Sequence, residues 1–180
     1  MRYVTDALVD LHGEQPWFGS RMNVWTTGLL QCLAIDSTST HIAAGDTSGQ
    51  IIIWSGLQNA AAAAAAGVTL DARTAGMTVA TIHWHAHPVG ALAFSSDGLY
   101  LLSGGREAVL VIWQLQTLKR TYLPRLGGPI THISPCVHDG ARYAVSQEHN
   151  AIRMVALSTM QVCLELSGSG SYIVELYRIG

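Results

Sequence analysis

Charged residues are scarce in this 180-residue chain, and positive charge is the scarcer sign. Aspartate, glutamate, lysine and arginine make up 12% of the sequence, which is about half of their share in an average soluble domain. Ten lysines and arginines stand against 12 aspartates and glutamates, so the formal net charge is −2. A domain that holds DNA or RNA by charge alone has a clear basic excess. The composition therefore argues against that class of protein.

Cysteines and long apolar runs are also few. The three cysteines, Cys32, Cys136 and Cys163, are odd in number and have no Cys-x-x-Cys spacing, which excludes a disulfide framework and a zinc knuckle. A reducing compartment suits such a chain best. The N-terminus lacks the apolar core of a secretory signal, and no run approaches the roughly 18 apolar residues of a membrane span. We therefore expect a soluble intracellular protein.

One pattern recurs three times along the chain, at 43–54, 102–113 and 144–155. In each copy an apolar strand ends in small residues, a tight polar turn follows, and a second apolar strand comes next. An Asp-Gly pair lies five residues before the second and the third copy, and this pair favours a hairpin because glycine takes a positive φ without steric cost. The second and third copies start 42 residues apart. That period is typical of a four-stranded propeller blade.

The pattern predicts an all-β chain of three clear four-stranded blades and a partial one, an incomplete propeller. Seven alanines at 60–66 form a loop insert before the outer strand of the first blade. Closure takes about four to eight blades, so we expect a fragment, a truncated gene model, or a chain that closes with a partner. The predicted units are the end of a preceding blade or irregular structure at 1–27, blades at 28–88, 89–128 and 129–166 (the last degenerate), and an irregular tail or the start of another blade at 167–180. The predicted strands are 89–94, 100–103, 109–113 and 119–123 in the middle blade, 130–134, 143–146, 151–156 and 161–166 in the third, and 78–84 as the outer strand of the first.

The middle unit resembles a WD repeat, through the strings 94–98, 101–105 and 111–113. The resemblance implies a WD-repeat β-propeller, with departures from the family pattern. We therefore expect the buried Asp–His–Ser–Trp hydrogen-bond network of the family to be incomplete here, and the blades to depend more on apolar packing. The departures are Trp113-Gln114 and Trp54-Ser55 in place of Trp-Asp, Ser48, Glu107 and His149 in place of the turn aspartate, and Ala86-His87 in place of Gly-His.

Longer strings resemble a nucleolar WD-repeat subunit of the small-subunit processome. They are 101–111 followed by Trp113, 123–127, and His83-Trp84-His85. The resemblance implies a non-catalytic scaffold of the nucleus and nucleolus that supports pre-rRNA processing, 18S rRNA maturation, ribosome biogenesis and RNA polymerase I transcription. It implies other processome proteins as partners and an indirect contact with the pre-rRNA and snoRNP particle. It implies no membrane partner, no small-molecule substrate, and no catalytic, cofactor-binding or metal-binding residue.

Two sets of residues are candidates for chemistry and have simpler structural interpretations. The imidazoles of His83, His85 and His87 could converge on one metal because alternate residues of a strand share a face. The favoured interpretation is that His83 and His85 end an outer strand and that His87 takes the family's histidine position. Asp97 and Asp139 are candidate acids and bases, but they occupy equivalent hairpins of different blades and are predicted to be turn residues.

The remaining candidates are serines, a glycine pair, tryptophans and cations. Ser103 and Ser146 lack a nucleophile elbow and an ordered triad. Gly104-Gly105-Arg106 has no phosphate-loop context and is predicted to be a strand-end turn. Trp54 and Trp113 are predicted core residues. The basic cluster of the chain consists of Arg106, Lys119, Arg120 and Arg125; it either contacts RNA phosphate or an acidic partner or forms a solvated rim.

Two other functions remain open at this point. A general WD-repeat interaction adaptor, for example a substrate receptor of a ubiquitin ligase, has the same fold. A metal-dependent hydrolase could use His83, His85 and His87. Elemental analysis of the purified chain separates the hydrolase from the two scaffold functions.

Overall fold

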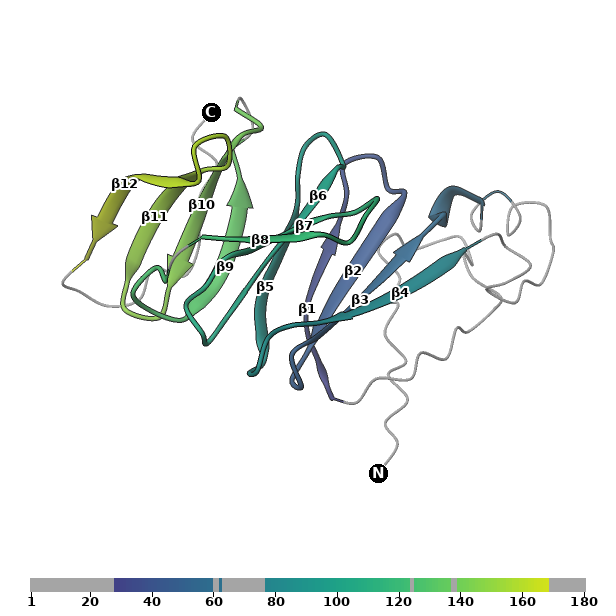
Figure 1. The fold of residues 1–180 in the computed structure, drawn as a ribbon, viewed down its shortest axis with the longest axis horizontal. Helices are drawn as coiled ribbons and strands as arrows, with labels where there is room; N and C mark the ends of the chain where they lie inside the picture. Colours follow the sequence, from purple (N-terminus) through teal and green to yellow (C-terminus); the bar gives the residue numbers. More distant parts are fainter. Residues whose placement is uncertain (1–27, 60–61, 63–76, 124, 137–138, 169–180) are drawn as a thin grey trace, which may run out of the picture.

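The chain folds into three sheets that follow one another along the sequence. The computed structural model describes residues 28–59, 62, 77–123, 125–136 and 139–168. Within these residues there are three four-stranded antiparallel sheets, with orders β1-β2-β3-β4, β5-β6-β7-β8 and β9-β10-β11-β12. Figure 1 shows the three sheets side by side in chain order, so that each sheet is one sequence repeat.

The strand positions agree with the sequence prediction to within two residues at each end. Strands β5 and β11 match the predicted ranges, and each Asp-Gly pair lies between the first and second strands of its sheet. The division into blades at the stated boundaries stays a prediction. Segments 1–27 and 169–180, and the alanine tract apart from residue 62, lie outside the described residues. The strands are β1 (Leu30–Ile35), β2 (His41–Asp46), β3 (Gln50–Ser55), β4 (Thr78–His83), β5 (Val89–Phe94), β6 (Tyr100–Gly105), β7 (Val111–Gln114), β8 (Arg120–Tyr122), β9 (Ile130–Pro135), β10 (Arg142–Gln147), β11 (Ala151–Ala156) and β12 (Gln161–Ser167).

The core lies between neighbouring sheets. Successive side chains of a strand point to opposite faces, and the middle sheet is covered on both faces, so its strand β6 is buried from Leu101 to Gly105. Each fully buried aliphatic side chain contributes roughly 1.5–3 kcal/mol. The seam between the first and second sheets includes Ala43, Ile51, Ile53, Val89, Leu92, Phe94 and Trp113. The seam between the second and third sheets includes Ala91, Leu102, Leu110, Ile112, Ile130, Tyr143, Val145 and Val155.

Two glycines, Gly45 of β2 and Gly104 of β6, set how closely the inner strand of the following sheet approaches. A Cβ atom on Gly45 would lie 2.7 Å from the Cβ of Val89, the first residue of β5. A Cβ atom on Gly104 would lie 2.8 Å from the Cβ of Ile130, the first residue of β9. Such distances are far below a carbon–carbon contact. Each seam therefore requires a residue without a side chain opposite the first aliphatic residue of the next sheet.

The outer faces of the first and third sheets carry exposed apolar side chains. Leu33 and Val79 of the first sheet are 60% and 51% exposed, and Leu164 and Leu166 of β12 are 46% and 54% exposed. Strand pairing places Leu33 beside Ala44 on one sheet face, and Leu164 beside Met154 on another. The described part of the chain is thus an open array of blades, as an incomplete propeller requires.

Candidate functional site

Four side chains of the middle blade form a continuous hydrogen-bonded chain. The Trp113 indole Nε1 lies 2.9 Å from the Ser103 hydroxyl oxygen, which lies 2.9 Å from Nε2 of His85. The opposite ring nitrogen, Nδ1 of His85, lies 3.3 Å from the Glu107 carboxylate. Strands β6 and β7 supply the serine and the tryptophan, while the histidine and the glutamate lie in loops at the same end of the sheet. The Trp84 and His85 rings pack nearly perpendicular to each other, with centroids 5.0 Å apart.

The pKa shifts of His85 and Glu107 determine which group donates and which accepts in each hydrogen bond. Burial lowers the pKa of His85, although the charge and hydrogen bond of Glu107 oppose this effect. Burial raises the pKa of Glu107, but hydrogen bonds from its own backbone, the His87 N–H and the His85 ring outweigh burial and leave this pKa below its ordinary value. At neutral pH the imidazole is therefore neutral and the carboxylate accepts only. Trp113 donates to Ser103, Ser103 donates to Nε2 of His85, and the Nδ1–H of His85 donates to Glu107.

Two expectations about this network are wrong. The network is complete in the middle blade, because Glu107 replaces the family's aspartate and its carboxylate still reaches the histidine ring. The histidine of the network is His85 and not His87. The side chain of His87 is exposed, and its backbone N–H donates to Glu107 across 2.7 Å.

Within this network, the hydrogen bonds join serine to histidine and histidine to glutamate in the same order as in a hydrolase triad. The sequence order of these residues predicts no triad, yet the fold brings them together. Ser103 is 0% exposed, His85 is 1% exposed, and the serine oxygen already accepts the indole N–H of Trp113. A carbonyl substrate cannot reach this hydroxyl, so the arrangement stabilises the blade.

The other two blades lack this arrangement among their described residues. In the first sheet Ala44 takes the place of Ser103, and the buried Nε1 of Trp54 has no hydrogen-bond partner. In the third sheet Val145 and Val155 take the places of the serine and the tryptophan, and both are 0% exposed. The outer two blades depend on apolar packing at these positions, as expected.

The three histidines of the His-x-His-x-His string do not converge. The ring Nε2 of His83 lies 3.1 Å from the Ser48 carbonyl oxygen, His85 is buried in the network, and the His87 side chain is exposed. Across the residues that the structure describes, no group of three or more His, Cys, Asp or Glu side chains is placed to hold a metal ion. The three imidazoles of the string therefore lie in separate surroundings.

The aspartates of the two Asp-Gly pairs act in their own hairpins. The Asp97 carboxylate accepts from the Ser95 hydroxyl and the Leu99 N–H, and Gly98 has a φ of 69°. The Asp139 carboxylate accepts from the Ala141 N–H and pairs with Arg142. These bonds agree with the predicted turn roles.

The predicted basic cluster is split between the two ends of the middle sheet. Arg106 follows β6, whereas Lys119 and Arg120 follow the turn after β7. Consecutive turns of antiparallel strands lie at opposite ends of a sheet. Arg125 lies near Arg106, because the adjacent Leu126 N–H donates to the Ala108 carbonyl oxygen. The interpretation of the four cations as one cluster is wrong.

Sequence reasoning missed a buried carboxylate in the first blade. Asp36 is 4% exposed, and it accepts the His41 N–H across 2.9 Å and the hydroxyls of Thr38 and Thr40 across 2.6 Å each. Burial raises the pKa of this carboxyl, but the hydrogen bonds from His41, Thr38 and Thr40 outweigh burial and hold the pKa well below its ordinary range. The Asp-Ser-Thr-Ser-Thr run at 36–40 was the available signal, because such residues favour local side chain–backbone bonds.

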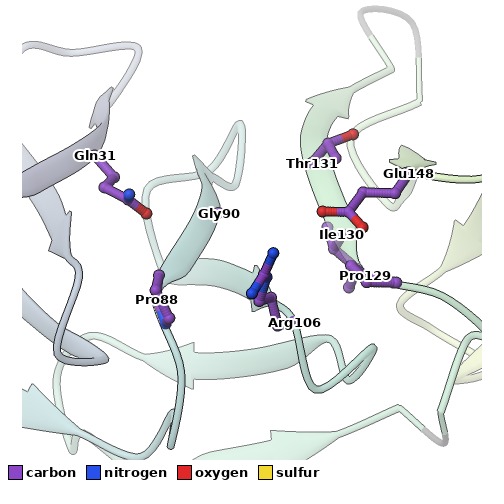
Figure 2. Close-up of a pocket in the computed structure, with 8 residues that line it drawn as sticks. All are labelled: Gln31, Pro88, Gly90, Arg106, Pro129, Ile130, Thr131 and Glu148. Atoms are coloured by element: carbon purple, nitrogen blue, oxygen red, sulfur yellow. The ribbon is translucent and has the colours of Figure 1, made fainter. Parts of the chain in front are cut away.

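A hollow of about 420 Å³ lies beside the inner strands, at the end of the sheets where the network lies. It was also missed. Figure 2 shows Gln31, Arg106 and Glu148 extending toward this space from three different blades. The lining residues are Gln31, Pro88, Gly90, Arg106, Pro129, Ile130, Thr131 and Glu148. The sequence signal was the pair of strings Pro88-Val89-Gly90 and Pro129-Ile130-Thr131, which place a proline two residues before equivalent positions of two inner strands.

The repeated antiparallel four-stranded sheets and the buried Trp–Ser–His–acid chain define WD-repeat propeller blades, here as part of a propeller. The model of one family, the first β-propeller of WD repeat-containing protein 75, matches residues 23–150. The chain belongs to this family.

Relatives agree with this assignment, and a solved structure agrees with the fold. U3 small nucleolar RNA-associated protein 17 of Schizosaccharomyces pombe is 40% identical over 91 residues, and WD repeat-containing protein 75 of Danio rerio is 34% identical over 128 residues. These alignments cover 51% and 71% of this chain but only 11% and 14% of the relatives. The solved structure of U3-55K superposes with a TM-score of 0.64 at 17% identity, over 79% of this chain and 40% of that one. This last likeness concerns the fold alone.

Proposed function

We propose that the chain acts as a non-catalytic scaffold of the nucleolar small-subunit processome. In this role it supports pre-rRNA processing, 18S rRNA maturation, ribosome biogenesis and RNA polymerase I transcription. The observation that carries the proposal is family membership over residues 23–150. A relative that is 40% identical bears the name of a U3 small nucleolar RNA-associated protein, which supports a place in the nucleus and nucleolus.

A scaffold suits the chemistry of the described residues. The one Ser–His–Glu chain among them is closed to solvent, and the three histidines of the string point to separate surroundings. No helix within the described ranges is long and apolar enough to cross a membrane. The function needs no cofactor, small-molecule substrate or membrane, because a propeller binds its partners through loops and sheet edges that a rigid core positions.

The partners in this proposal are other processome proteins. The net charge of −2 and the separation of Arg106 from Lys119 argue against a continuous basic surface over the described residues, and binding of an RNA backbone relies on several phosphate contacts at once. Contact with the pre-rRNA and snoRNP particle is therefore indirect in this proposal, through those proteins.

Affinity purification of the tagged chain from nuclear extract, with sequencing of the RNA and identification of the proteins retained, tests the proposal. Recovery of 5′ pre-ribosomal RNA together with processome subunits supports it. Recovery of ubiquitin-ligase subunits without that RNA overturns it in favour of an adaptor. Recovery of chaperones alone also overturns it for this chain. The Trp113→Ala variant, whose core is disrupted, is the matched control and is expected to lose the specific partners.

A further inference from the structure

The hollow beside the inner strands is built from one device repeated in three blades. The register of each inner strand slips at one residue: Gln31 in β1, Gly90 in β5 and Thr131 in β9. All three residues line the hollow. A β-bulge re-aims a side chain, and bulges occur often beside binding sites. The repeated slip therefore turns equivalent positions of three blades toward one shared space.

Close packing of two inner strands shapes the side of this space where Gly90 lies. Gly90 is exposed, and a Cβ atom there would lie 2.5 Å from the Ile130 carbonyl oxygen, so this glycine allows β5 and β9 to approach closely beside the hollow. The hydroxyl of Thr131 is held 2.7 Å from that of Ser146. Pro88 and Pro129 add apolar surface to the lining.

Two opposite charges face the same space without meeting each other. Arg106 follows β6 and Glu148 follows β10, and both are exposed. Neither forms an ion pair with another described residue. Figure 2 shows them on different walls of the hollow, with the Gln31 amide opposite them. A ligand that carries both charges can therefore satisfy both residues.

The buried network holds the backbone on either side of the arginine. Arg106 lies between Gly105, whose carbonyl oxygen accepts the Ala108 N–H, and Glu107, whose carboxylate binds His85 and His87. On the other wall, the backbone N–H of Glu148 donates to the Pro129 carbonyl oxygen across 3.1 Å. The backbone at both positions is therefore held before a ligand binds, so that only the two side chains have to be ordered.

We propose that this hollow docks an extended segment of a partner protein that carries an acidic side chain for Arg106 and a basic side chain for Glu148. Guanidinium and carboxylate groups match in a two-bond geometry, and a carboxylate accepts a lysine ammonium equally well. Glu148 repels the phosphates of a nucleic acid, so the paired charges favour a polypeptide over RNA. This inference is independent of the processome proposal, because the site can bind such a segment in any assembly.

The test uses short synthetic peptides and the full chain. Fluorescent peptides in a glycine–serine background carry one aspartate and one lysine at increasing separations, in both orders, and are compared with peptides that carry only one of the charges. Fluorescence anisotropy measures binding. We expect at least one two-charge peptide to bind more tightly than its single-charge controls, and the Arg106→Glu or Glu148→Arg change to weaken it by about fivefold or more.

Matched variants separate the site from net charge. Lys119→Glu changes the net charge as much as Arg106→Glu but lies at the other end of the sheet, so it is expected to leave binding unchanged. The double variant Arg106→Glu/Glu148→Arg is expected to prefer the peptide with the two charges in the opposite order. Equal loss with Lys119→Glu overturns the proposal. A uridine oligonucleotide that binds more tightly than the peptides, and whose binding is lost with Arg106→Glu, also overturns the proposal. The same holds if no two-charge peptide is preferred while tryptophan fluorescence shows that the chain is folded.

Discussion

The indole N–H of Trp113 donates a hydrogen bond of 2.9 Å to the hydroxyl of Ser103, and both side chains are buried. The equivalent tryptophan of the first blade, Trp54, has a buried N–H with no partner among the described residues. One residue type at one position of the repeat therefore has two different energetic roles. In the middle blade the ring fills the core and anchors a polar chain, whereas in the first blade it only fills space.

This difference predicts unequal effects of one substitution. Trp113→Phe removes a satisfied N–H and leaves Ser103 without its donor, which costs about 1–3 kcal/mol beyond the loss of ring volume. Trp54→Phe loses similar volume and removes an unsatisfied buried group, so we expect a smaller loss. Trp113→Ala is expected to cost about 3–5 kcal/mol. Urea unfolding followed by circular dichroism measures each change. Equal losses for the two Phe variants, or less than about 1 kcal/mol for Trp113→Ala, would contradict the assigned roles.

Acidification below neutral pH is expected to weaken the middle blade through His85. Burial lowers the pKa of His85 in the folded chain, so the unfolded chain binds more protons below the ordinary histidine pKa of about 6.5. Stability therefore rises with pH in this range, and it falls as the pH drops below about 6.5. Unfolding free energies between neutral and mildly acidic pH measure the slope. His85→Gln is expected to reduce this slope, while His83→Gln, at an exposed position, is expected to leave the slope unchanged. An unchanged slope in His85→Gln counts against the buried neutral imidazole.

A second loss of stability is expected in stronger acid, from Asp36. Its folded pKa lies well below the ordinary value because the hydrogen bonds from His41, Thr38 and Thr40 outweigh its burial. Its stabilising contribution is complete above the unfolded pKa of about 3.9 and is lost as the pH falls from there toward the folded pKa. Asp36→Asn is expected to lower stability at neutral pH by about 1.5–3 kcal/mol and to flatten the acid limb. Acid titration of far-ultraviolet circular dichroism measures this limb, and an identical limb in the variant would remove Asp36 from the explanation.

The seam between the second and third sheets is expected to reject a single added methyl group. Gly104→Ala places a Cβ atom within 2.8 Å of three Ile130 side-chain carbons, and such overpacking costs about 1–3 kcal/mol. Gly168→Ala has no contact closer than 3.7 Å and is the control, expected to change stability by less than about 0.5 kcal/mol. The double variant Gly104→Ala/Ile130→Val is expected to lose less than the sum of its single changes. Strict additivity in thermal or urea unfolding would show that these two residues do not press on each other.

Most of the fold could be predicted from local patterns. The repeated strand–turn–strand pattern located all three sheets, and the Asp-Gly turns supported the second and the third, because strand period and turn chemistry depend on neighbours in the sequence. The histidine network could not be located in the same way. Its histidine precedes the inner strand by four residues, at His85, and a glutamate replaces the expected aspartate; only the geometry shows that the longer side chain still reaches the ring.

The hollow and the charges depend on relations between blades. Gln31, Gly90 and Thr131 are unremarkable in sequence, and the strand slips at these residues become visible only in the paired registers. Arg106 and Lys119 lie close in sequence, but the strand β7 between them carries them to opposite ends of the sheet. A composition argument counts such residues without placing them, which explains why the predicted basic cluster was wrong.

The position that holds a glycine in the first two sheets holds a serine in the third, and this difference limits how the blades can be exchanged. Gly45 and Gly104 accept Val89 and Ile130 from the following sheet, but the third sheet has Ser146 at this position, bonded to Thr131. The side chain of a valine or isoleucine cannot pack at Ser146 as it packs at the glycines of the first two seams. The blades are consequently not interchangeable: a copy of the middle blade grafted after the third would meet a hydroxyl instead of a gap. Shuffling or duplicating blades in this propeller therefore requires the serine and its neighbour to be redesigned together with the incoming strand.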